Sequence, residues 1–177
     1  MKRILGVFSV VVFTASVFAQ QSPAKNPVSS AVREILPRQQ KKLTEAVGEM
    51  PADKFSYKPT QQQMSFAHLA MHITQSNNYL CAKISGTPAP KQPELKDTDA
   101  KDKLIGALKA SFDFCNAALS KVEDSKLGDP VELFGGRQGT RAFAMIALTN
   151  DWADHYAAAA MYLRLNGLLP PTAQPKK

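Results

Sequence analysis

The sequence predicts an all-α protein that folds as an antiparallel four-helix bundle. Apolar residues recur every three to four positions in four long segments, which is the spacing of side chains on one face of an α-helix. Stretches that contain proline and glycine separate these segments and are typical of loops. The helices that we expect span residues 28–50, 62–84, 99–122 and 141–166. Amphipathic helices of this length, joined by loops, suggest a bundle in which they share one core.

The first helix, residues 28–50, keeps a helical period of apolar side chains and has a candidate N-cap at Ser29 or Ser30. Pro37 lies inside this pattern. Because proline lacks a backbone N–H and clashes with the preceding turn, we expect it to kink the helix or to move its start later in the chain. Pro51 then ends the helix.

The later helices have their own start and stop signals. Ser65 is a plausible N-cap for the second helix, and Gly86 ends that helix. A loop with several prolines leads to the third helix, in which apolar residues again recur at three to four positions. The fourth helix begins near Arg141 and stops before a glycine and a pair of prolines.

The segment between the third and fourth helices, residues 123–140, is rich in glycine and irregular. Val131–Phe134 is a candidate for a short extended piece. Gly135–Gly139 resembles a phosphate-binding loop only in its glycine content, because the Lys-Ser/Thr pair of such a loop is missing. We therefore interpret it as a turn that lies over the mouth of the bundle.

Residues 1–19 have the pattern of a secretory signal peptide. Lys2 and Arg3 supply a basic start, and the apolar run that follows is too short for a comfortable membrane span. Val17 and Ala19 place small residues at the two positions that signal peptidase reads. We expect export to the periplasm or the extracellular space, with no stable membrane insertion after cleavage.

The rest of the chain divides into a flexible leader at residues 20–27, one domain at residues 28–169 and a tail at residues 170–177. A domain of this length can bury a sizeable core. The chain has 22 Lys and Arg against 15 Asp and Glu, and its formal net charge is +7. The lysines alternate with acids, whereas nucleic-acid binding needs a concentrated basic patch, so we expect no nucleic-acid partner.

Cys81 and Cys115 are the only cysteines, and each lies in an apolar helical pattern. Export would place them in an oxidising compartment, where such a pair tends to form a disulfide. The alternative is a pair of inert buried thiols. A redox-active pair has less support, because the sequence contains no Cys-x-x-Cys motif.

Asp151 and His155 are four residues apart in a long apolar segment, so they share one face of the expected fourth helix. His68 and His72 have the same spacing on the second helix, and the chain has no other histidine. A buried carboxylate is costly unless it is paired or bound to a metal. The pattern therefore hints at a metal site between two helices.

Three motifs follow one another in the chain: Ser65–Ile73 (SFAHLAMHI), then Asp151 with His155, then Tyr162–Gly167 (YLRLNG). Their order and spacing resemble the DinB/YfiT-like superfamily, in particular its exported members. The resemblance implies a four-helix bundle in which three histidines hold a divalent metal, often nickel or zinc. By position, the first ligand falls on His72, the last on His155 and the middle one on Asp151, where the family usually has histidine.

An aspartate at this position changes the expected chemistry. Two histidines and one carboxylate form a known facial ligand set with open positions, and a carboxylate is a legitimate ligand for zinc, manganese or iron. His68, one turn before His72, could orient a ligand or replace one. The alternative is a member that has lost its metal and keeps a hydrogen bond between Asp151 and His155 in its core.

Two functions are consistent with these residues. The first is a metal-dependent hydrolase or a thiol-transferase-like enzyme, in which a divalent metal on His72, Asp151 and His155 activates water or a thiol. The second is a non-catalytic exported bundle that binds a small-molecule ligand or acts as an interaction protein. Either protein could form a homodimer through its helix faces.

Overall fold

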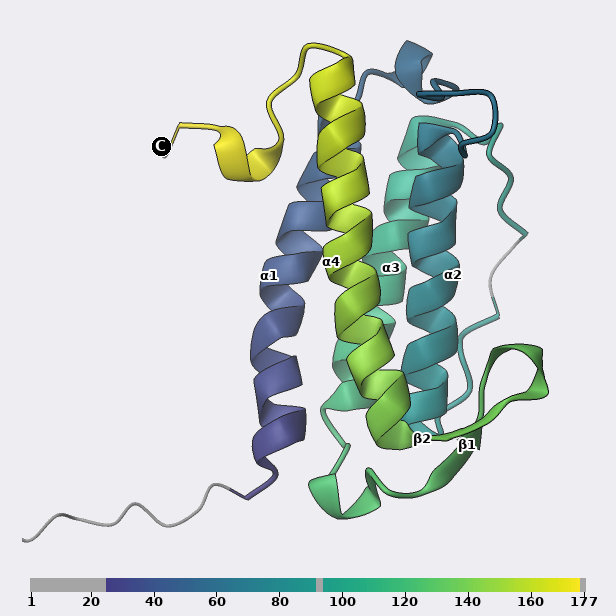
Figure 1. Ribbon diagram of the computed structural model, residues 1–177, viewed down its shortest axis with the longest axis vertical. Helices are drawn as coiled ribbons and strands as arrows, with labels where there is room; N and C mark the ends of the chain where they lie inside the picture. The colour runs from purple at the N-terminus through teal and green to yellow at the C-terminus, as the bar shows by residue number, and fades with distance from the viewer. Residues whose placement is uncertain (1–24, 92–93, 176–177) are drawn as a thin grey trace, which may run out of the picture.

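The computed structural model describes residues 25–91 and 94–175, which form a bundle of four long helices with a small β-hairpin at one end (Figure 1). The elements are α1 (Pro27–Glu49), α2 (Phe66–Ser85), α3 (Lys101–Leu119), β1 (Pro130–Glu132), β2 (Gln138–Thr140) and α4 (Arg141–Leu165). Short 3-10 helices lie at Ala52–Lys54, Asp124–Lys126, Phe134–Gly136 and Pro171–Ala173. The prediction of an all-α four-helix bundle is confirmed, and the hairpin is a minor addition to it.

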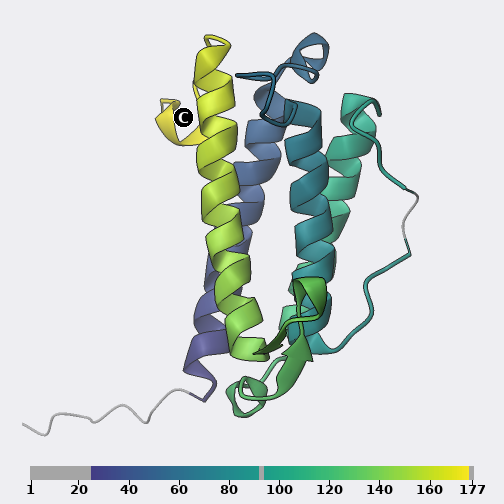
Figure 2. The same ribbon diagram turned by 45° about the vertical axis from the view of Figure 1, so that its right-hand side comes forward.

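The helices do not simply alternate in direction along the chain. Helix α3 begins beside the end of α1, where Nζ of Lys101 donates to the carbonyls of Gly48 and Met50 at 2.7 and 2.8 Å. The connection between α2 and α3 thus returns the chain to the end at which α2 began (Figure 2). As a result α1 is antiparallel to α3 and α2 is antiparallel to α4, whereas α2 and α3, which follow one another in the chain, run parallel. A long crossover connection of this kind is one of the known ways to build a bundle.

The helix ends follow the local signals in most places. The side chain of Ser65 accepts a hydrogen bond from the backbone N–H of His68 at 3.0 Å, and Thr140 accepts one from Phe143 at 3.2 Å. Gly86 closes α2 with a φ of 73°, a conformation that glycine adopts without strain. Helix α1 continues through Pro37 to Glu49, so the proline does not move the start of the helix. The prediction of an N-cap at Ser29 or Ser30 is wrong, because α1 begins at Pro27 with Asn26 in the N-cap position, and both serines lie inside the helix.

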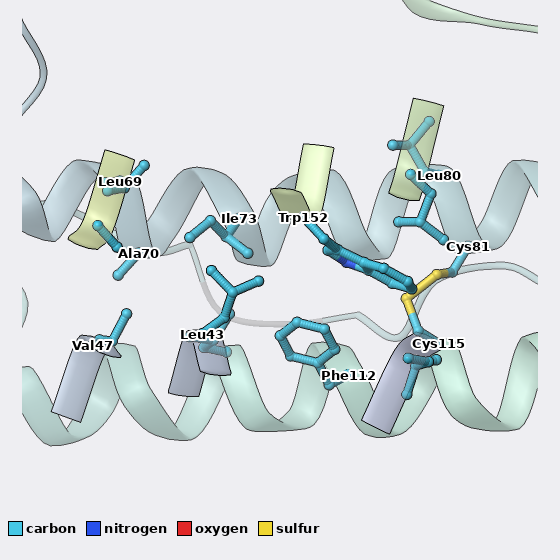
Figure 3. Close-up of a cluster of buried hydrophobic side chains, with 14 of the residues drawn as sticks. Leu43, Val47, Leu69, Ala70, Ile73, Leu80, Cys81, Phe112, Cys115 and Trp152 are labelled. Carbon is cyan, nitrogen blue, oxygen red and sulfur yellow. A yellow bond between two sulfur atoms is a disulfide. The ribbon is translucent and has the colours of Figure 1, made fainter. Parts of the chain in front are cut away.

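The centre of the bundle is filled by apolar side chains from all four helices (Figure 3). Leu43, Ile73, Phe112 and Trp152 come from α1, α2, α3 and α4 in turn, and each is fully buried. The rings of Phe112 and Trp152 lie with their centroids 5.9 Å apart. Burial of such side chains is the main source of stability in a bundle of this size.

A disulfide between Cys81 on α2 and Cys115 on α3 crosses this core (Figure 3). The two Cα atoms are 5.2 Å apart, and both residues are fully buried. The expected pairing is therefore present, and the alternative of two free thiols is not.

The β-hairpin lies in the segment before the fourth helix that we expected to be irregular, and β1 overlaps the short extended piece that we expected at Val131–Phe134. Its strands are antiparallel, with Val131 opposite Gly139. A Cβ atom at Gly139 would lie 2.5 Å from Cδ1 of Leu133, so a larger residue at this position would require the end of the leucine side chain to shift. Gly135 and Gly136 have φ values of 68° and 77° and form the turn that we expected in this stretch, whereas Gln138 and Gly139 belong to β2.

The structure describes most of the C-terminal tail but little of the chain before α1. The expected signal peptide, residues 1–19, and most of the leader lie outside the described residues. Helix α1 already begins at Pro27, the last residue of the expected leader. In the tail, the hydroxyl groups of Thr172 and Tyr156 lie 2.7 Å apart, which holds the chain end against α4. Within residues 25–91 and 94–175, every helix is too short or too polar to cross a membrane.

Candidate metal centre

The bundle brings together the three residues that the sequence marked as candidate ligands. His72 lies on α2, and Asp151 and His155 lie on α4, which packs antiparallel against α2. One ligand atom from each residue can be chosen so that all three lie within 4.8 Å of one another. The two imidazole rings have centroids 4.8 Å apart. All three side chains are partly buried, so the group is accessible from the surface of the bundle.

Asp151 and His155 interact across one turn of α4. Nδ1 of His155 lies 2.6 Å from the backbone carbonyl oxygen of Asp151 and 3.4 Å from its Oδ1. Because a carbonyl oxygen can only accept a hydrogen bond, this contact requires a proton on Nδ1. In the neutral imidazole, Nε2 then carries the lone pair that can bind a metal.

The carboxylate of Asp151 has one oxygen that the protein does not use. Oδ2 is buried and has no hydrogen-bond partner among the described residues. A buried carboxylate oxygen without a partner is unfavourable by about 1–3 kcal/mol or more, since the group has lost its water. A cation beside Oδ2 would remove this cost. The lone pair on Nε2 of His155 could bind the same cation.

The two histidines respond differently to this environment. Burial and the neighbouring His155 lower the pKa of His72 below its ordinary value, and the charge of Asp151 only partly offsets this. Burial also lowers the pKa of His155, but the hydrogen bond to Asp151 and its charge outweigh burial and raise the pKa above its ordinary value. At neutral pH His72 is therefore ready to act as a neutral ligand, whereas a metal would compete with a proton on His155.

The other polar residues near the site take lesser positions. His68 is half-buried on α2 and does not belong to the group of three, although its charge contributes to the lowered pKa of His72. A role for His68 in orienting a ligand stays a prediction. Asp154 is exposed, and its charge contributes to the raised pKa of His155. Trp152, between Asp151 and His155 in sequence, points into the core and is fully buried.

Two cavities flank the three residues along the groove between α2 and α4. The larger, about 440 Å³, is lined by His155 and by apolar side chains that include Met64, Leu69 and Met161. The smaller, about 170 Å³, is lined by Asp151 and by residues of the β-hairpin. A ligand in either cavity would touch one member of the group.

The hairpin residues in this region were not among the candidate site residues from the sequence. Phe134 and Arg137 line the smaller cavity together with Asp151. Their distance in sequence from His68 and His72 and from Asp151 and His155 hides this relationship. The one available signal was an aromatic residue beside glycines in a loop, since loops often carry functional side chains.

The arrangement fits a divalent metal. Two imidazoles and one carboxylate, with one lone pair and one carboxylate oxygen left free by the protein, match the donor set of zinc, manganese or iron sites. His72, Asp151 and His155 would supply three ligands, and the neighbouring cavities leave room for further ligands from solvent or substrate.

Solved structures of known proteins share this fold. A DinB-like protein from Bacillus subtilis is 22% identical, covers 82% of this chain and 99% of its own, and superposes with a TM-score of 0.65. A DinB-like protein from Bacillus cereus is 16% identical, covers 80% of this chain and 95% of its own, and has a TM-score of 0.66. At these identities the likeness shows the fold and carries no further conclusion.

A variant of a mycothiol-dependent maleylpyruvate isomerase is also similar, with 13% identity and a TM-score of 0.60. The match covers 73% of this chain and 59% of the isomerase. Among curated proteins, none matches this sequence. The family model of the DinB superfamily matches residues 35–159, which is well over half of the chain and includes both candidate ligand pairs. The chain therefore belongs to the DinB superfamily.

Proposed function

We propose that this protein is a metal-dependent enzyme, a hydrolase or a thiol-transferase-like protein, whose metal is held by His72, Asp151 and His155. The observation that carries the proposal is the buried Oδ2 of Asp151, which has no partner in the described part of the chain and lies in a group with two imidazoles. A group of this kind in a family of bundles with inward metal sites is more simply explained by a cation than by packing.

The residues of the chain would prepare the site for catalysis in three ways. The contact of His155 Nδ1 with the Asp151 carbonyl, 2.6 Å long, fixes the orientation of the ring. The lowered pKa of His72 keeps that imidazole neutral. The cavities at either end of the group leave space for substrate. A bound divalent metal would supply Lewis-acid activation of water, a carbonyl or a thiol.

Metal analysis tests the proposal directly. The purified mature protein, prepared without added chelator, is expected to contain about one divalent ion per chain by inductively coupled plasma mass spectrometry. His72→Ala and His155→Ala should each reduce metal affinity by about 10-fold to 100-fold or more, because each removes one of only three protein ligands.

His68→Ala is the matched control, because it removes the same side chain one turn earlier on the same helix. It should retain metal at the wild-type stoichiometry. A wild-type protein without metal, together with unchanged stability in all three variants, would contradict the proposal. That result would favour the non-catalytic bundle, in which the Asp151–His155 contact is only structural.

The two reaction classes can be separated with the same variants. Hydrolysis of para-nitrophenyl acetate reports on activated water, and conjugation of a low-molecular-weight thiol to an electrophile reports on activated thiol. Whichever activity belongs to the protein should follow metal content across wild type, His155→Ala and His68→Ala. Activity that persists in metal-free His155→Ala would show that the site is not responsible.

We also propose that the protein is exported. The Cys81–Cys115 disulfide supports this, because such bonds persist mainly in oxidising compartments. Cell fractionation and N-terminal sequencing of the mature chain test it, and we expect the sequence to start at Gln20. A full-length chain in the reducing cytoplasm would contradict it.

A further inference from the structure

The groove between α2 and α4 has a continuous wall formed by one face of α4. Residues Phe143, Ala147, Asp151, His155 and Ala158 follow one another at three- to four-residue spacing, and each lines one of the two cavities. The candidate ligands therefore lie between the cavities along a single groove. In Figure 1 the hairpin lies at the end of this groove where α4 begins.

The hairpin end of the groove displays aromatic rings to solvent. Phe134 is 62% exposed and Phe143 is 43% exposed, and both line the smaller cavity. Phe134 stacks on Tyr79 of α2 with ring centroids 3.8 Å apart, which fixes its orientation. Exposed aromatic side chains that flank a cavity are a usual feature of sites that bind a flat apolar group.

The same cavity has one cationic side chain. The guanidinium of Arg137 lies 4.4 Å from the centre of the Phe143 ring, so the ring holds it at the edge of the cavity. Arg137 is exposed and forms no ion pair with the described residues. Its N–H groups therefore remain available to an anionic group on a ligand, for which a guanidinium is well suited.

The other end of the groove has no guanidinium. Asp154, His155 and the amides of Gln62 and Gln63 line the larger cavity, and no lysine or arginine lines it among the described residues. Each cavity has one carboxylate in its wall, Asp154 in the larger and Asp151 in the smaller, and only the smaller has Arg137 as well. Arg137 is thus the group that favours the hairpin end for an anionic ligand.

We propose that the hairpin end of the groove is a binding subsite for a planar apolar group that carries a carboxylate or another anion, with the planar group between Phe134 and Phe143 and the anion on Arg137. A volume of about 170 Å³ suits one such group, since a cavity of about 150 Å³ in another protein accepts benzene. This subsite depends on the proposed function in one respect only, that its ligand is the enzyme's substrate. The rest of that substrate would extend past Asp151 to the metal.

The test uses para-fluorobenzoate and its neutral counterpart para-fluorobenzamide, which have the same ring and nearly the same size. Binding of each to the full mature protein is measured by fluorine NMR, first after treatment with chelator and then with zinc added. The chelated protein is measured first because a carboxylate could otherwise bind the metal itself. We expect the benzoate to bind more tightly than the benzamide in both states.

Arg137→Gln should weaken binding of the benzoate by about tenfold, the usual contribution of a charge-assisted hydrogen bond, and leave the benzamide unchanged. Arg38→Gln is the matched control, because Arg38 lines a separate cavity between α1 and α4. It should leave both affinities unchanged. Circular dichroism checks that the two variants fold alike.

Three results would overturn the inference: no binding of the benzoate, equal binding of the two ligands, or equal loss in the Arg137 and Arg38 variants. These results are separable from the fate of the proposed function, because metal content is measured on the same preparations. A protein that never retains metal but binds benzoate through Arg137 contradicts the enzyme and supports the subsite. A protein that holds stoichiometric metal but binds benzoate equally well with and without Arg137 supports the enzyme and contradicts the subsite.

Discussion

The indole Nε1 of Trp152 donates a 2.7 Å hydrogen bond to Oδ1 of Asn77, and both side chains are fully buried. Nδ2 of Asn77 in turn donates to the hydroxyl of Ser111 at 3.0 Å, and this hydroxyl donates to the carbonyl of Leu108 at 2.7 Å. The bonds connect α4, α2 and α3 through the middle of the core. Because each polar side-chain group in this network has a partner, the network orients three helices instead of destabilising them.

Replacement of Asn77 should therefore be costly. In Asn77→Ala the indole N–H of Trp152 stays buried without an acceptor, and we expect a loss of about 2–3 kcal/mol in the free energy of unfolding. Urea denaturation followed by fluorescence of Trp152, the only tryptophan, measures this. Asn150→Ala, at an exposed position on α4, is the control and should change stability by less than about 0.5 kcal/mol. Equal stability of the two variants would show that the network contributes nothing.

The disulfide should contribute to stability on a similar scale. It closes a loop with a sequence separation of 34 between α2 and α3, and bonds of this kind typically add about 2–4 kcal/mol. We expect Cys81→Ser combined with Cys115→Ser to lose this amount in chemical denaturation. Dithiothreitol should lower the stability of the wild type but not that of the double variant. A wild type that is indifferent to reduction would contradict a stabilising bond.

Features that depend on near neighbours in sequence could be predicted. Ser65 caps α2 because its hydroxyl accepts a hydrogen bond from the backbone N–H of His68, three residues later. This short spacing is visible in the sequence. The shared face of Asp151 and His155 follows from their spacing on one helix. The spacing of residues could not predict that His72 on α2 lies opposite this face of α4. That prediction came from the family resemblance.

Features that depend on the path of the chain could not be predicted. The parallel direction of α2 and α3 depends on the route of the long connection between them. The position of Arg137 beside Asp151 depends on how the hairpin folds back over the groove. Both are set by contacts between distant segments, and no local periodicity or capping pattern encodes them.

The aspartate in the ligand set should affect which metal is preferred. Asp151→His would create the three-histidine set that the family resemblance implies. Because imidazole favours nickel and zinc and carboxylate favours manganese, we expect the affinity ratio of nickel to manganese to rise by at least about tenfold. Competition dialysis followed by metal analysis measures the ratio. Asp154→His, which adds an imidazole at an exposed position outside the group, should leave the ratio unchanged, and the same rise in both variants would argue against the assigned site.

The start of α1 is capped by a residue far along the chain. Asp124 accepts hydrogen bonds from the backbone N–H groups of Val28 and Ser29 at 2.8 and 2.9 Å, and its own N–H donates to Oδ1 of Asn26 at 2.9 Å. Burial alone would raise the pKa of Asp124, but the bonds from Ser29 and Val28 and the charge of Arg33 outweigh it and lower the pKa. An anion at a helix N-terminus is also favoured by the helix dipole.

This lowered pKa predicts how stability depends on pH. A carboxylate whose pKa is lower in the folded than in the unfolded protein stabilises the fold above its unfolded pKa, and this contribution is lost as the pH falls through the folded value. Asp124→Asn imitates the protonated side chain, so it should be less stable than the wild type at neutral pH. The difference should shrink steadily in urea denaturation as the pH is lowered below about 4, the ordinary pKa of aspartate. Asp53→Asn, at an exposed carboxylate, should follow the wild-type curve. A gap between wild type and Asp124→Asn that stays constant with pH would mean that the charge of Asp124 does not stabilise the start of α1.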